Sequence, residues 1–134
     1  MTRFYGLDEA NEQLAEVRPL LERLAAQRLD LIRLRDRAVT VGSGASADAE
    51  DTDDELRNLR LRMQGIIDQM QAAVSRIDAL GIVLRDIETG LIDFPALVAG
   101  RQIWLCWRLG EGDVGWWHDL SSGFSARQPF SELA

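Results

Sequence analysis

Apolar side chains recur every three or four residues through the middle of the chain. This seam is unbroken over eight positions, which are Leu56, Leu59, Met63, Ile66, Met70, Ala73, Ile77 and Leu80. Such spacing is typical of an α-helix that packs against another helix. Ile67 and Val74 widen the apolar stripe, so we expect the helix to contact more than one neighbour. Gly81 follows the seam and can end the helix.

The N-terminal part of the chain repeats this pattern and predicts a second long helix. Its apolar positions run from Leu7 to Leu24 and resume from Leu31 to Val41 after a slip in phase. Residues 42–52 are small, glycine-containing and acidic, which is typical of a flexible, exposed loop, with a charged docking loop as the functional alternative. Residues 1–81 are therefore expected to form an antiparallel, coiled-coil-like helical hairpin.

The length of this hairpin predicts a contact with a second molecule. A helix over residues 53–80 is about 42 Å long at 1.5 Å per residue. The strands predicted after it span at most roughly 30 Å. The hairpin should therefore overhang the rest of the fold and leave part of its apolar stripe uncovered. We expect a homodimer that buries this stripe.

After Gly81 the period of the apolar positions changes to that of β-strands. Short apolar segments are separated by glycine-containing turns at residues 87–90, 99–100 and 110–113. Pro95 lies in the second segment and assigns it to a sheet edge or a bulge. Residues 82–134 are expected to form a small antiparallel β-meander of three or four strands and a C-terminal tail, packed on the hairpin. The predicted fold class is α+β, in a single domain over residues 1–134.

Composition narrows the classes of partner. The chain has 134 residues and a net charge of −7, and all fifteen of its basic residues are arginine. Neither half carries the basic surface that phosphate backbones require, so no nucleic acid partner is expected. No apolar run approaches the roughly 18 residues of a membrane span, so no membrane partner is expected. The single cysteine and the early polar residues favour a cytoplasmic protein without disulfides.

Residues 104–118 hold all four tryptophans, the only cysteine and the only histidine of the chain. A tight turn in this hairpin would pair Leu105 with His118 and place Cys106 and His118 on opposite faces of the sheet. In that favoured register the two side chains cannot share a metal, and Cys106 is a buried apolar residue. A register shifted by one residue would instead place Cys106 opposite His118.

Two neighbouring tryptophans, Trp116 and Trp117, offer a candidate exposed aromatic contact. Side chains alternate in a strand, so one of the two must point away from the main core. An outward tryptophan is typical of a contact with another subunit, a peptide or a ring-shaped ligand. The rest of the aromatic cluster is expected to be sheet core.

His118 needs a partner for each ring nitrogen if it is buried. Glu111 and Asp93 are among the carboxylates expected near it. A metal would require the imidazole and two or more such carboxylates, whereas a structural histidine needs only hydrogen bonds. The sequence leaves both interpretations open.

Four segments together resemble the bacterial family called domain of unknown function 2203. They are GLDEANEQLAEVRPLLERL, GIVLRDIETGLIDFPALVAGR, LCWRLGE and WHDLSSGFSARQP. The resemblance implies a small cytoplasmic protein with a helical hairpin and a compact C-terminal motif region, and it supplies no catalytic residues. It also draws attention to polar residues that a core does not need, namely Asp93, Glu111, His118 and Arg127. If they converge, the acids and the imidazole suit a cation and the arginine suits a phosphate or carboxylate; otherwise Arg127 is expected to pair with an acid.

Two functions follow from these observations. The favoured one is a non-enzymatic interaction or binding module that homodimerises through its hairpin, takes no cofactor, and docks a protein partner or a small ligand. The alternative is a metal-dependent or acid–base hydrolase-type enzyme that uses Asp93, Glu111 and His118 with a divalent metal. Convergence of these side chains on one point would favour the enzyme or metal site.

Overall fold

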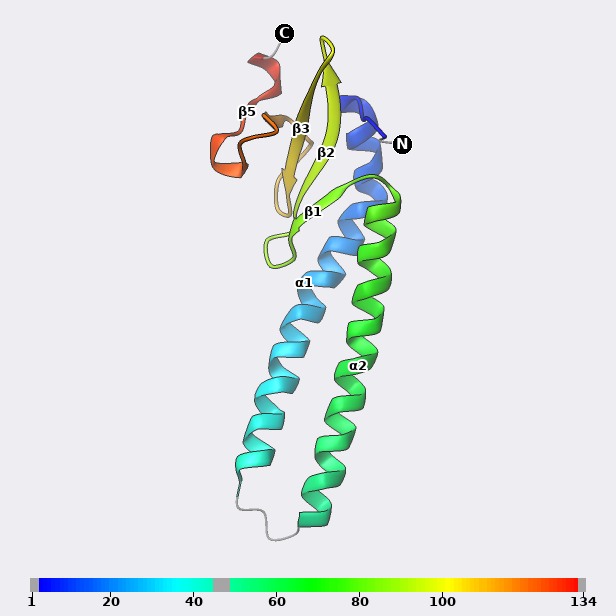
Figure 1. The fold of residues 1–134 in the computed structure, drawn as a ribbon, viewed down its shortest axis with the longest axis vertical. Helices are drawn as coiled ribbons and strands as arrows, with labels where there is room; N and C mark the ends of the chain where they lie inside the picture. Colours follow the sequence, from blue (N-terminus) through cyan, green and yellow to red (C-terminus); the bar gives the residue numbers. More distant parts are fainter. Residues whose placement is uncertain (1–2, 45–48, 133–134) are drawn as a thin grey trace.

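A computed structural model describes residues 3–44 and 49–132 as a helical hairpin joined to an antiparallel sheet (Figure 1). Helix α1 covers Leu7–Ser43 and helix α2 covers Ala49–Ala79. The two helices lie side by side and antiparallel, and the strands gather at one end of the hairpin. This arrangement confirms the predicted α+β class.

Both helices extend further than predicted into the acidic segment at residues 42–52. Helix α1 continues through Ser43, and α2 begins at Ala49. Glu50 and Asp51 lie in the first turn of α2, where the helix dipole stabilises negative charge. Residues 45–48, the rest of the predicted loop, lie outside the described residues.

Helix α2 ends as the sequence predicts, at a glycine. Gly81 adopts a φ of 77°, a left-handed conformation that favours glycine. Its N–H donates to the carbonyl of Asp78 at 2.9 Å, and the N–H of Ile82 donates to the carbonyl of Ile77 at 3.3 Å. These bonds satisfy carbonyls that the helix end would otherwise leave unpaired.

The sheet is a meander in which each strand pairs with the next along the chain. The five strands are β1 (Val83–Asp86), β2 (Leu91–Val98), β3 (Arg101–Arg108), β4 (Trp116–His118) and β5 (Gln128–Pro129). The prediction of three or four strands was too low because the C-terminal tail returns to pair with β4. A strand as short as β5 has no alternating pattern by which the sequence could reveal it.

Pro95 lies in β2, which is an inner strand with a regular register to β3 and is neither the edge nor the bulge that was predicted. Its pairing with β1 extends only from Leu91 to Asp93. At Pro95 itself, the carbonyl accepts the backbone N–H of Tyr5 at 2.7 Å. The proline therefore occupies a position where β1 does not need a ladder donor.

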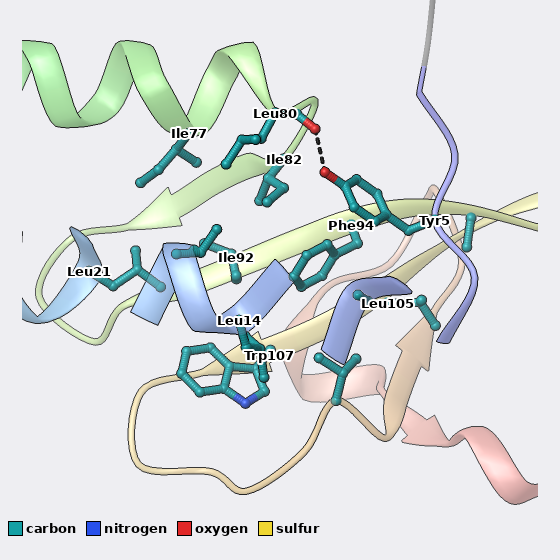
Figure 2. Packing of buried hydrophobic residues seen from close by; sticks show 14 of the residues in the cluster. Tyr5, Leu14, Leu21, Ile77, Leu80, Ile82, Ile92, Phe94, Leu105 and Trp107 are labelled. Carbon is teal, nitrogen blue, oxygen red and sulfur yellow. Dashed lines mark hydrogen bonds between the residues drawn. The ribbon is translucent and has the colours of Figure 1, made fainter. Parts of the chain in front are cut away.

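One face of the sheet packs against the hairpin and forms the core (Figure 2). Alternate side chains of β2 and β3 point to this face, among them Ile92, Phe94, Leu105 and Trp107. The Tyr5 hydroxyl donates to the carbonyl of Leu80 at 2.5 Å and joins the N-terminal segment to the end of α2. Because side chains alternate along a strand, the intervening residues of β2 and β3 lie on the opposite face.

The hairpin extends well beyond the sheet, as its predicted length requires (Figure 1). In the described part of this overhang, Leu34 and Leu59 are buried between the helices, whereas Leu61 is 65% exposed. Neither helix is long and apolar enough to cross a membrane, judged over residues 3–44 and 49–132.

Candidate functional site

The register of β3 and β4 decides which side chains share a face of the sheet. Trp104 pairs with His118, and Cys106 pairs with Trp116. The favoured pairing of Leu105 with His118 was therefore wrong by one residue. As a result Cys106 and His118 lie on the same face, opposite the hairpin, and not on opposite faces.

Side chains from α1 and β3 hold the connection between β3 and β4 in this register. Asn11 of α1 accepts the N–H of Val114 at 2.6 Å and donates to the Val114 carbonyl at 3.3 Å. The Trp107 indole donates to the carbonyl of Gly112 at 2.8 Å. The connection is longer than the tight turn that was predicted, and the pairing is shifted by one residue. A shift of one residue moves the side chain of His118 to the other face of the sheet.

Asp93, Cys106 and His118 form a buried group that we call the Asp–Cys–His cluster. Asp93 on β2 pairs directly with Cys106 on β3. One ligand atom of each side chain lies within 4.8 Å of the others. The three residues are only 2%, 1% and 3% exposed. Three polar groups with so little access to water must satisfy one another or hold an ion.

The contacts of His118 require a proton or a metal ion between its Nε2 atom and Asp93. Nδ1 lies 2.9 Å from the carbonyl oxygen of Asp119, and Nε2 lies 3.0 Å from Oδ1 of Asp93. A carbonyl can only accept, so Nδ1 carries a hydrogen. A neutral imidazole would then point the lone pair of Nε2 at a carboxylate oxygen. Either a proton or a metal ion must lie between these two atoms.

Arg85 completes the surroundings of Asp93. Its Nε donates to Oδ2 of Asp93 at 2.9 Å, and its guanidinium lies over the Trp104 ring with 5.0 Å to the centroid. The Arg85 side chain is 42% exposed. Both carboxylate oxygens of Asp93 therefore have a partner, as a buried carboxylate needs.

Cys106 is protonated at neutral pH in the absence of a cation. Burial raises the pKa of its thiol to about 12, and the negative charge of Asp93 acts in the same direction, while Arg127 opposes them. The thiol is therefore not an activated nucleophile. It becomes a thiolate only if a cation takes the place of its proton.

Glu111 and Arg127 pair with each other, and Arg127 also interacts with Cys106 at the side of the cluster. Nη1 of Arg127 donates to Oε1 of Glu111 at 2.9 Å, and Nη2 donates to Oε2. The backbone N–H of Arg108 also donates to Glu111. Burial alone would raise the pKa of the Glu111 carboxyl, but these hydrogen bonds outweigh it and hold the pKa below its usual value. The four residues therefore do not converge on one point: Asp93 contacts His118, and Glu111 contacts Arg127.

The two neighbouring tryptophans divide between the faces of the sheet. Trp117 is 6% exposed and belongs to the core, so it is not an exposed contact. Trp116 is 36% exposed, and the Arg127 guanidinium lies 4.8 Å from its ring centroid. The candidate aromatic contact is therefore reduced to Trp116.

A cavity of about 330 Å³ opens onto the Asp–Cys–His cluster. Arg85 lies on its wall, and the C-terminal tail supplies the side that faces the sheet. The remaining lining residues are Leu91, Leu120, Ser122, Gly123 and Phe124. The three cluster residues therefore form part of the wall of a cavity of small-molecule size.

Sequence reasoning missed Cys106 and Arg85 as members of the site. The turn at residues 99–100 was recognised, and Val98 pairs with Arg101 directly beside it. Counting outward from that pair places Cys106 opposite Asp93. The missing signal for Cys106 was therefore present in the sequence.

Comparison with protein families finds one match, to the family described as "Uncharacterized conserved protein (DUF2203)", over residues 3–130. This span includes every residue of the cluster and the Glu111–Arg127 pair. No curated protein and no solved structure matches the chain.

Proposed function

The chain belongs to the family of uncharacterised conserved proteins DUF2203, and we propose that this member binds a divalent transition-metal ion through Asp93, Cys106 and His118. The observation that carries the proposal is the convergence of three buried ligand atoms, two of which, Nε2 of His118 and Oδ1 of Asp93, must have a proton or a metal ion between them. A metal ion meets that need and also converts the neighbouring thiol of Cys106 to a ligand.

The donor set favours zinc among the common divalent ions. It offers one imidazole nitrogen, one thiolate sulfur and one carboxylate oxygen. Sulfur and nitrogen ligands select zinc and similar ions, whereas magnesium and calcium prefer oxygen. The hydrogen bond from Nδ1 of His118 to the Asp119 carbonyl is the support that orients a histidine for binding through Nε2. Arg85 steadies Asp93 in the same way.

A tetrahedral ion held by Asp93, Cys106 and His118 would have a fourth position for water or a ligand. Open positions are typical of catalytic zinc sites, and structural sites use four protein ligands. A divalent zinc ion lowers the pKa of a water molecule in such a position to about 7. This supports the metal-dependent hydrolase over a module without a cofactor, with Cys106 in the place that Glu111 was expected to take.

The metal content of the untagged protein tests this proposal. After dialysis against zinc, the wild-type chain should retain about one ion, measured by plasma mass spectrometry. His118→Ala and Cys106→Ala each remove a ligand and should weaken binding at least about 100-fold, since loss of a supporting residue alone costs 10–100-fold. Glu111→Gln is the matched control and should retain the ion, because Glu111 lies outside the cluster.

The variants must remain folded for this comparison, which circular dichroism establishes. Equal zinc retention by the wild type and by folded His118→Ala would remove the cluster from the site. Wild-type protein that retains no zinc, manganese, iron or cobalt would refute the proposal.

A second proposal concerns the hairpin: we infer that two copies of the chain associate through it. Half-buried apolar side chains from α1, α2 and the β1–β2 turn line a hollow of about 540 Å³ and include Leu31, Ile67, Met70, Val74 and Ile87. The seam and the wider stripe of α2 thus reach a surface that the sheet does not cover. A second hairpin offers the same stripe and can bury both copies around a two-fold axis.

Light scattering after size-exclusion chromatography tests this association. The wild-type protein should show twice the 15.0 kDa mass of one chain. Ile67→Glu places a charge in the hollow and should give the single-chain mass, while Leu61→Glu, on an exposed position of the same helix, should leave the mass unchanged. A wild-type monomer at high concentration would contradict the proposal.

A further inference from the structure

We propose that the cavity over the Asp–Cys–His cluster binds a small organic carboxylate, held between Arg85 and the metal ion; this inference rests on the proposed metal site. The carboxylate would take the open coordination position with one oxygen. The same carboxylate would accept hydrogen bonds from the guanidinium of Arg85.

The balance of charge in the site favours an anion. A divalent ion carries two positive charges, which the carboxylate of Asp93 and the thiolate of Cys106 neutralise together. Because the charge of Asp93 is then counted against the metal ion, it no longer neutralises Arg85, although the two side chains are hydrogen-bonded. The other described residues that line the cavity, apart from His118, are uncharged. One positive charge therefore remains for a ligand to neutralise.

Arg85 is placed to make that contact. It uses Nε toward Asp93, and a guanidinium carries five N–H donors in all. Its side chain is 42% exposed, and it lies on the cavity wall. The contact of the guanidinium with the Trp104 ring, 5.0 Å from its centroid, helps to hold Arg85 in place for a two-pronged carboxylate contact.

The shape and lining of the cavity favour an organic anion over a free phosphate. Leu91, Leu120 and Phe124 contribute apolar surface opposite the polar floor. A volume of about 330 Å³ lies at the small end of ligand sites. A carboxylate with a short aliphatic chain would place its charge on the floor and its chain against these side chains.

Visible absorption of the cobalt-substituted protein tests the proposal. Co²⁺ bound to a thiolate absorbs visible light. A ligand that enters the coordination shell of the ion changes this absorption. Titration with butyrate should give a saturable change at lower concentration than acetate, and inorganic phosphate should bind more weakly than either. Arg85→Gln should raise the dissociation constant for butyrate at least tenfold. Arg57→Gln, an exposed arginine on the hairpin, is the control and should leave it unchanged.

The possible failures of this experiment are distinguishable. If no cobalt spectrum appears, the metal site is refuted and the carboxylate inference falls with it. If the spectrum appears but butyrate does not change it, or if Arg85→Gln responds like the wild type, the metal site stands and the carboxylate inference is overturned. Tighter binding of phosphate than of butyrate also overturns it.

Discussion

Replacing Gly90 by alanine should lower the free energy of unfolding by about 2–5 kcal/mol. Gly90 lies in the β1–β2 turn with a φ of 65°, which costs other residues about 1–2 kcal/mol. An added Cβ would lie 2.4 Å from Cγ and 2.5 Å from Cδ1 of Leu109, far inside van der Waals contact. Overpacking of this kind adds about 1–3 kcal/mol. Urea unfolding followed by tryptophan fluorescence measures the loss.

Gly100→Ala is the matched control for this prediction. Gly100 has a similar φ of 76°, but an added Cβ there meets no atom within 4 Å. Gly100→Ala should lower the free energy of unfolding only by the cost of the left-handed backbone conformation, about 1–2 kcal/mol. The double variant Gly90→Ala, Leu109→Ala should show less than the sum of its single losses, because the second change removes the clash. Equal losses for Gly90→Ala and Gly100→Ala would show that the contact with Leu109 is unimportant.

The apparent affinity for Zn²⁺ should fall about tenfold when the pH is lowered from 7 to 6. The proton of the Cys106 thiol competes with the ion, because burial and the negative charge of Asp93 raise the pKa of this thiol to about 12. Each proton displaced changes the apparent affinity about tenfold per pH unit, and a lower pH favours the protonated, metal-free thiol.

Calorimetry in two buffers with different ionisation enthalpies counts the protons released. Wild-type protein should release about one proton per ion from the Cys106 thiol at pH 7. Cys106→Ala, titrated with a large excess of zinc, should release about one proton fewer than the wild type, because the thiol is absent. Binding of zinc to the wild type without proton release would contradict the protonation of Cys106.

The helices were predictable because their determinants are local. The seam from Leu56 to Leu80 and the glycine that follows it specify a helix and its end without reference to the rest of the chain. The helix start was placed too late, since the acidic residues before Asp53 are compatible with either a loop or a first helical turn. Local sequence does not decide between these two states.

The site was only half predictable, and the reason lies in the two β-hairpins. The tight turn at residues 99–100 fixes Asp93 opposite Cys106 by counting alone. The β3–β4 connection has no such turn, and its shape depends on Asn11 in another element. A single residue of slip there reverses the face of His118 and separates it from Cys106. Glu111 was expected near His118, but it pairs with Arg127. The same shift of register decides which of these two residues lies beside it.

The pair of hydrogen bonds between Asn11 and Val114 also affects the order in which the protein assembles during synthesis. These residues are 103 positions apart, so Asn11 leaves the ribosome long before its partner exists. The hairpin can form from residues already synthesised, because its contacts lie within the first 80 residues. The strand that carries His118 can reach its register only when translation has passed Val114. The side chains of the proposed metal site should therefore come together only after the hairpin has formed and translation has passed His118.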